Sequence, residues 1–177
     1  GEINVYDNER LKKMGEYICF THINDDYVYN YAECSPEIAV PPSLVYRFGK
    51  KVESDFMKSY AAYLTKKTVD KGIISTGDLF NKINFVVHYS EMSSVEAKQP
   101  LAADAYFPES QLVIARSNEG TNEGFFFGMK GGNNNEFGNQ NDAGSFILYA
   151  NGKPLIIDVG KKDKTLSSIN NNRYSIW

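Results

Sequence analysis

The chain has 177 residues, of which 42% are hydrophobic and 14% aromatic, and its formal net charge is −3. This length predicts one domain or two small units. The acidic balance and the lack of a basic stripe argue against a nucleic-acid-binding protein, and no apolar run approaches the roughly 18 residues of a membrane span.

The first half of the chain has the apolar periodicity of helices. The predicted helices cover residues 8–23, 42–48, 54–67 and 76–88. Asp7 or Asn8 is suited to cap the first helix, and Ser54 and Thr76 are suited to cap the third and fourth. Gly49 follows the second helix, where glycine commonly ends helices.

On the fourth helix, apolar side chains recur along one side, and we expect them to face the core. They are Leu79, Phe80, Ile83, Val86 and Val87.

The two histidines, His22 and His88, lie near predicted helix ends, where a histidine commonly complements the helix dipole. Between the first two helices the sequence predicts an irregular segment. Its alternating tyrosines Tyr27, Tyr29 and Tyr31 can stack on sugar rings, although sealing a domain edge is the commoner role for such side chains.

Beyond the fourth helix, the composition of residues 90–109 is that of a linker. The pattern then changes to short β-prone runs at 111–115 and 124–129. Asn151-Gly152 joins two further apolar runs and predicts a type I′ hairpin. The fold class is therefore α+β, with N-terminal helices followed by an antiparallel sheet, divided into a helical region (1–89), a linker (90–109) and a β region (110–177).

The stretch from Lys130 to Gly160, KGGNNNEFGNQNDAGSFILYANGKPLIIDVG, resembles the central motif of the heparinase II/III family of polysaccharide lyases. Family members typically read KGGHN-x-E-S-H-N-H-N-D-x-GSF, followed by a turn and a strand ending in I-D-x-G. Three further segments are similar to the family: residues 44–50, residues 115–117, and residues 167–177, which end in RYSIW. The matching positions in the central motif are Lys130, Gly131, Gly132, Glu136, Asn139, Asn141, Asp142, Gly144, Ser145, Phe146, Gly152, Asp158 and Gly160.

The resemblance implies the last turns of a helical toroid followed by the start of a β-sandwich. It also implies β-elimination on uronic-acid polysaccharides, a structural zinc ion, and a periplasmic or secreted location. Three family histidines are replaced, by Asn133, Gly138 and Gln140. Glycine cannot move a proton, and a neutral amide is a poor zinc ligand. We therefore assign no catalytic residue and expect this chain to be inactive alone.

Four polar residues of the loop are candidates to bind an acidic polysaccharide or oligosaccharide through hydrogen bonds to sugar hydroxyls: Asn133, Glu136, Asn139 and Gln140. Asp158 matches the family's carboxylate ligand for zinc, but one carboxylate does not make a zinc site, and no cofactor is expected in this chain. A calcium site is an alternative; loop Asn and Gly residues that only supply turn geometry are the simpler interpretation.

Lys130 and Arg116 are candidates to face an acidic sugar, although exposed salt bridges are the more common role for such residues. Two other functions stay open: a carbohydrate-binding module without chemistry, and an interaction fragment that forms a homo-oligomer through exposed sheet edges. Cys19 and Cys34 are expected to be small buried residues, and their pairing is left open.

Overall fold

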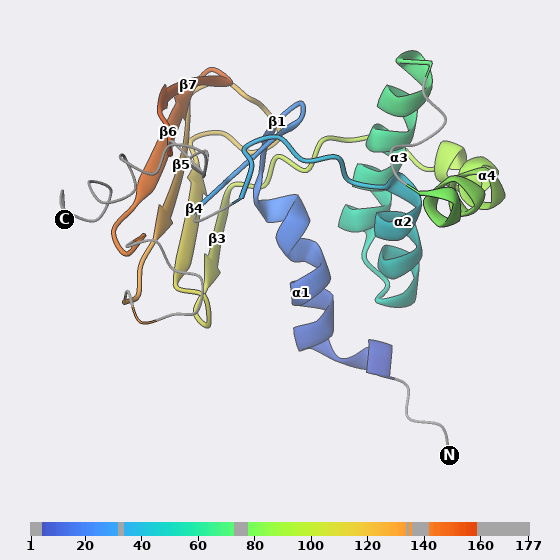
Figure 1. The fold of residues 1–177 in the computed structure, drawn as a ribbon, viewed down its shortest axis with the longest axis horizontal. Helices are drawn as coiled ribbons and strands as arrows, with labels where there is room; N and C mark the ends of the chain where they lie inside the picture. Colours follow the sequence, from blue (N-terminus) through green and yellow to red (C-terminus); the bar gives the residue numbers. More distant parts are fainter. Residues whose placement is uncertain (1–4, 32–33, 73–77, 134, 136–141, 159–177) are drawn as a thin grey trace, which may run out of the picture.

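The computed structural model describes residues 5–31, 34–72, 78–133, 135 and 142–158 (Figure 1). Its elements are η1 (Val5–Asp7), α1 (Glu9–Phe20), β1 (His22–Asn24), β2 (Tyr27–Val28), α2 (Pro42–Lys51), α3 (Asp55–Asp70), α4 (Leu79–Ser94), β3 (Asp104–Phe107), β4 (Leu112–Arg116), β5 (Phe125–Lys130), β6 (Phe146–Ala150) and β7 (Lys153–Ile156). Helices precede an antiparallel sheet, so the predicted α+β class is confirmed.

Side-chain caps begin three of the helices. Asn8 accepts a hydrogen bond from Arg10 N (2.9 Å) at α1, and Ser54 accepts one from Met57 N (3.2 Å) at α3, as predicted. For α4 the predicted cap was wrong. Asp78 caps this helix, because its extended backbone turns the carboxylate back onto Asn81 N at 2.9 Å. Thr76 lies outside the described residues.

Helix α2 does not stop at Gly49, as the sequence predicted, but continues to Lys51. The structure gives a different reason for this glycine. A Cβ atom at position 49 would lie 2.7 Å from Met57 Cβ on α3, closer than such atoms approach. The absence of a side chain at Gly49 therefore permits the close contact between α2 and α3, and it does not end a helix.

The helical core is built from α1, α2, α3 and α4. The side of α4 that faces this core is not the side that the sequence predicted. Phe85 and Met92 are buried in this core. The five apolar residues that we expected to face inward are exposed instead: Leu79, Phe80, Ile83, Val86 and Val87. The helix is apolar on two sides, and periodicity alone did not distinguish them.

His22 is not at a helix end. Helix α1 ends at Phe20, and His22 belongs to β1, where it pairs with Val28 of β2 in a short antiparallel hairpin. The hairpin replaces the end of the predicted helix 8–23 and the start of the segment that was predicted to be irregular. His88 lies inside α4, with its ring 6.2 Å from the ring of Tyr46.

The five-stranded sheet has the order β3-β4-β5-β6-β7, with each strand antiparallel to the next. The predicted runs at 111–115 and 124–129 correspond to β4 and β5 within one residue. Asn151 (φ 49°) and Gly152 (φ 72°) both have positive φ between β6 and β7, which confirms the predicted hairpin. Residues 90–94 belong to α4 and 104–107 to β3, so the extended connection between them covers 95–103.

The sheet is apolar on both faces. Figure 1 shows it on one side of the molecule and α2, α3 and α4 on the other, with α1 and β1 between them. The face toward α1 and β1 forms a second core that includes Ile23, Tyr29, Leu112, Ile114, Phe126, Ile147 and Tyr149. The outer face exposes Tyr106, Val113, Phe125, Met129, Phe146 and Ile156.

The cysteines are both free. Cys19 is buried, as expected, whereas Cys34 is exposed, because it lies in the segment after the hairpin rather than in a core. Among the described residues, no helix is long and apolar enough to cross a membrane. The motif residues beyond position 158 lie outside the described residues.

Candidate functional site

The base of the loop between β5 and β6 is held together by backbone hydrogen bonds. Lys130 N donates to Ser145 O (2.9 Å), Gly144 N donates to Lys130 O (2.8 Å), and Ser145 N donates to Asp142 O (2.8 Å). Gly144 has a φ of +90°, which only glycine adopts readily. The two ends of the loop therefore leave the sheet side by side in a fixed geometry.

Polar side chains gather at this base. Lys130 and Asp142 are buried, and Lys130 Nζ donates to Gly131 O at 3.2 Å. Ser145 Oγ donates to Asp158 Oδ2 at 3.2 Å, which ties the end of β7 to the start of β6. A lysine and two carboxylates thus lie at the end of the sheet from which the loop extends.

Tyr29 from the N-terminal part of the chain lies against the same end of the sheet. It is 3% exposed, and its ring covers Gly128, where a Cβ atom would lie 2.5 Å from Tyr29 Cδ2. Burial raises the pKa of Tyr29, and the nearby Asp158, Tyr31 and Asp142 raise it further. Its hydroxyl is buried with no hydrogen-bond partner in the described part of the chain.

Tyr17 and Tyr31 extend this group of tyrosines. The rings of Tyr29 and Tyr31 are 5.8 Å apart. The pKa of Tyr17 is raised, first by burial and then by Tyr31 and Tyr29. The phenols of Tyr17 and Tyr29 therefore stay protonated well beyond neutral pH, so they cannot act as bases.

The predicted site residues are only partly covered by the structure. Asn133 is exposed, and its Oδ1 accepts a hydrogen bond from Asn135 N at 2.9 Å, which stabilises a local turn. Asp158 is half-buried at the loop base. Glu136, Gly138, Asn139 and Gln140 lie outside the described residues.

The described residues do not fit a structural zinc ion. They contain no group of three or more His, Cys, Asp or Glu side chains that could hold a metal. Both histidines of the chain lie in its first half, before the five-stranded sheet. The ring of His22 is hydrogen-bonded to Gln99 and Tyr60. Asp158 accepts a hydrogen bond from the Ser145 hydroxyl, and the described residues near it do not complete a metal site.

Lys130 and Arg116 do not form exposed salt bridges, because both are buried. Arg116 instead donates to backbone carbonyls, and its partners include His22 O (3.0 Å) and Ile23 O (3.1 Å) on β1 and Ala102 O (3.2 Å). Burial lowers the pKa of Arg116 to about 10. This arginine joins the sheet to the hairpin and does not face an acidic sugar.

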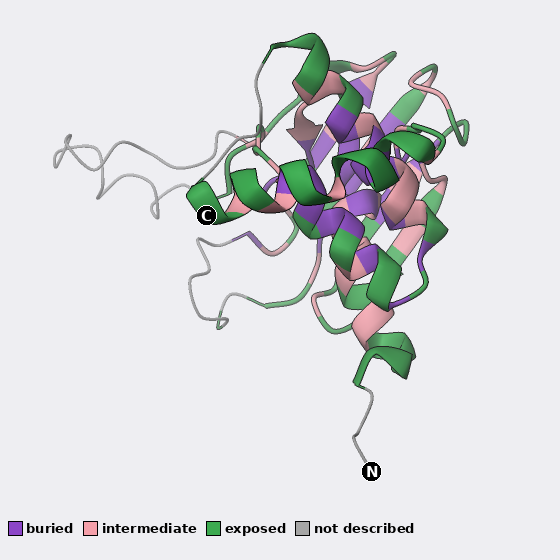
Figure 2. Cartoon of the chain, turned by 90° about the vertical axis from the view of Figure 1, so that its right-hand side faces the viewer, coloured by how far each residue is buried: buried purple, intermediate pink, exposed green. Residues whose placement is uncertain are grey.

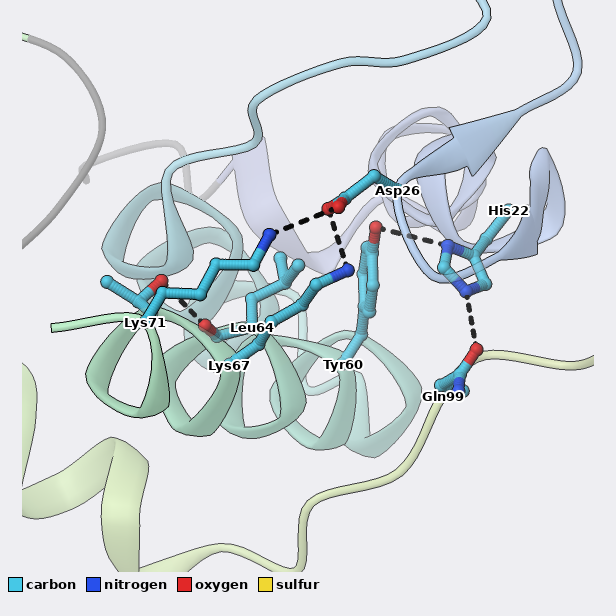
Figure 3. A network of polar contacts seen from close by, with 8 residues as sticks. His22, Asp26, Tyr60, Leu64, Lys67, Lys71 and Gln99 are labelled. Carbon is cyan, nitrogen blue, oxygen red and sulfur yellow. Dashed lines mark hydrogen bonds and ion pairs between the residues drawn. The ribbon is translucent and has the colours of Figure 1, made fainter. Parts of the chain in front are cut away.

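A second polar network lies near α3 (Figure 3). His22 Nε2 is 3.1 Å from Gln99 Oε1, and Tyr60 OH is 3.4 Å from His22 Nδ1. Burial lowers the pKa of His22 to about 4. The neutral ring donates through Nε2 and accepts through Nδ1, and it has no free nitrogen for a substrate or a metal.

Beside this network, a groove of about 340 Å³ opens next to α3. Its walls include Asp26, Val40, Leu64, Lys67 and Lys71. Both lysines already pair with Asp26, at 2.7 and 3.3 Å. Both lysines of the groove therefore share one carboxylate of the same chain, beside the aliphatic side chains of Val40 and Leu64.

We compared the chain with models of known protein families and with curated proteins, and neither comparison gave a match.

The sequence did not predict that Tyr29 is buried at the loop base. It suggested one set of loop tyrosines, Tyr27, Tyr29 and Tyr31, but of these only Tyr29 is buried against β5. Gly128 within an apolar strand was the available signal, because glycine in a strand often marks the close approach of another group.

Proposed function

We propose that this chain is a heparinase II/III-like module that binds uronic-acid-containing polysaccharide and does not cleave it alone. The supporting observation is the arrangement at the base of the β5–β6 loop. Backbone hydrogen bonds fix the loop ends there, and Tyr29, Asp142, Ser145 and Asp158 gather beside them. A polar loop on a rigid sheet is a frequent basis for binding sites.

Residues of this kind suit a glycan. Asn133 and Asn135, in the described part of the loop, are exposed, and their amides both donate and accept hydrogen bonds, as sugar hydroxyls do. Tyrosines contribute flat apolar rings and phenol donors. The expectation of a uronate rather than a neutral sugar comes from the resemblance of the central motif to the lyase family.

Cleavage by β-elimination requires more than this. A base must remove the C5 proton while an acid protonates the leaving oxygen, and both groups must come within about 3 Å of their targets. Burial raises the pKa values of Tyr29 and Tyr17 further above their ordinary range, so neither phenol supplies the base. Gly138 replaces the histidine of the family motif. The part of the chain that the structure describes therefore offers no matched acid and base beside a bound polysaccharide.

The proposal is tested by titrating the isotope-labelled chain with uronic-acid oligosaccharides and following its amide resonances. We expect shifts at Gly131, Gly132 and Asn133, and no ultraviolet absorbance from an unsaturated uronate product. Product formed by this chain alone would disprove the inactive assignment. A lack of shifts with a broad panel of acidic oligosaccharides would disprove glycan binding.

A pair of variants localises the site. Asn133→Ala removes an exposed amide side chain of the loop, and we expect it to weaken oligosaccharide binding several-fold. Tyr106→Phe removes a hydroxyl from the outer face of the sheet, where the side chain is 64% exposed, and binding should be unchanged. Equal effects of the two substitutions would place the binding site elsewhere.

The alternative is a carbohydrate-binding module unrelated to lyases. It predicts equal affinity for neutral and acidic oligosaccharides of the same length, whereas the proposed function predicts a preference for the acidic ones. A periplasmic or secreted location belongs to the same proposal, since extracellular polysaccharide is encountered there.

A further inference from the structure

Helix α4 carries a second apolar side that nothing in the described structure covers. Phe85 and Met92 point into the helical core, where they are 3% and 0% exposed. The exposed side carries Leu79 (73%), Phe80 (63%), Ile83 (54%), Val86 (64%) and Val87 (65%). Figure 2 looks onto this side of the molecule, where the helix that crosses the front is largely coloured as exposed. A helix that is apolar on both sides is typical of one packed on both sides.

The spacing along this side is that of a helix–helix seam. Phe80, Ile83 and Val87 follow one another at intervals of three and four residues, and Ser90 and Ser94 continue the same intervals. Alternating intervals of three and four keep side chains on the line where two helices meet. The exposed side of α4 is thus patterned for one partner helix.

The size of the side chains along this seam favours an antiparallel partner of the same sequence. The large residues Phe80 and Ile83 occupy the first half of α4, and the small residues Ser90 and Ser94 occupy the second half. In an antiparallel pair with Phe80 level with the partner's Ser90, large side chains meet small ones along the seam, and Ile83 meets the partner's Val87. A parallel pair would oppose large with large and leave a gap between the serines.

We propose that two copies of this chain form a dimer through antiparallel packing of their α4 helices. At about 100 Å² of apolar surface for each large side chain, one copy contributes on the order of 500 Å². The pair then buries on the order of 1,000 Å², which is near the lower limit of specific interfaces. A reversible dimer with a micromolar dissociation constant is therefore expected.

The test measures the mass of the full chain by sedimentation across a concentration series. We expect the mass to rise from one copy toward two copies, and Ile83→Glu and Val87→Lys each to raise the dissociation constant at least about 100-fold. Both sites are more than half exposed, so the fold should survive, and circular dichroism checks this. A chain that stays monomeric at millimolar concentration would overturn the proposal and assign the surface to a different polypeptide.

Mixing the two variants tests the register. In a mixed pair, the carboxylate introduced at position 83 faces the ammonium group introduced at position 87, and the opposite contact is wild type. We expect the mixture to recover dimer formation, although neither variant dimerises alone. The control is Tyr106→Glu on the outer face of the sheet, which should leave the dimer intact. Loss of the dimer in this control, or no recovery in the mixture, would contradict α4 packing.

Discussion

At the scale of single residues, His22 shows how burial fixes a protonation state. Its ring is 1% exposed and is bonded on both nitrogens, to Gln99 and to Tyr60. Burial, together with the positive charges of Arg116 and Lys67, outweighs the hydrogen bond to Gln99 and lowers the pKa to about 4. The folded protein therefore holds this imidazole neutral at neutral pH.

We predict that His22 makes the fold less stable in acid. In the unfolded chain a histidine titrates near its ordinary pKa of 6.5, but in the folded chain it titrates near 4. Between these values the unfolded state binds more protons, so the free energy of unfolding falls as the pH falls. The loss begins below about pH 6.5, is complete below about pH 4, and amounts to roughly 3 kcal/mol. Urea denaturation at a series of pH values measures it.

The other histidine provides the control for this prediction. His22→Gln should flatten the pH dependence between pH 4 and 6.5, while His88→Gln should leave it in place. If the pH dependence is the same in both variants, the carboxylates of the protein and not His22 account for its acid sensitivity.

At the scale of elements, Gly49 allows α2 to pack closely against α3. In an exposed helix, replacing glycine by alanine stabilises by about 1 kcal/mol. Here the added methyl group would lie 2.7 Å from Met57 Cβ and 3.3 Å from Ser54 O. We therefore predict that Gly49→Ala destabilises the protein by about 1–3 kcal/mol. Thermal unfolding measures the change, and Lys66→Ala on exposed α3 surface should stay within about 0.5 kcal/mol.

The β6–β7 hairpin depends on a second glycine. Gly152 has a φ of +72°, and a Cβ atom there would also meet Asn24 Nδ2 at 2.7 Å. We predict that Gly152→Ala lowers the free energy of unfolding by more than the roughly 1–2 kcal/mol expected for backbone strain alone. Gly120→Ala isolates the strain, because Gly120 has a φ of +77° and no neighbouring atom within 4 Å. Equal losses in urea denaturation would show that the contact with Asn24 contributes nothing.

These elements show what the sequence could predict. The Asn151-Gly152 hairpin was predictable because turn chemistry is local: two adjacent residues needed positive φ. The inward side of α4 was predicted wrongly, because both sides are apolar and the choice depends on how α2 and α3 pack against Phe85 and Met92. Gly49 was misassigned for the same reason, since the cause is a contact with another helix.

The candidate site was less predictable than the fold. Sequence motifs indicated the loop around Asn133 and the carboxylate of Asp158, which lie near one another in the sequence. They did not indicate Tyr29, which reaches the loop base only because the chain folds back over Gly128. The contribution of a distant segment to a site follows from tertiary packing and has no local signature.

At the scale of the whole molecule, two hydrophobic cores are joined by a small set of contacts. One core lies among the helices and includes Cys19 of α1, and the other lies on the inner face of the sheet and includes Ile23 of β1. Helix α1 contributes to both cores, because its Tyr17 packs against the sheet core, and the β1–β2 hairpin belongs to the sheet core. Arg116 completes the connection, because its guanidinium group on β4 donates to the carbonyls of His22 and Ile23.

We predict that Arg116 makes the two cores unfold together. Arg116→Ala would leave at least two buried carbonyls without donors, each at a cost of about 1–3 kcal/mol, and would remove the contact of the guanidinium with the Phe126 ring at 4.9 Å. We expect the free energy of unfolding to fall by about 3 kcal/mol or more. The wild-type chain should unfold in one transition, whether followed by helical circular dichroism or by amide exchange of β4, β5 and β6, whereas the variant should give two separate transitions. Lys98→Ala breaks an exposed ion pair with Glu96. This control should change neither the free energy of unfolding nor the number of transitions. Coincident transitions in Arg116→Ala would show that α1 and the hairpin couple the two cores without this arginine.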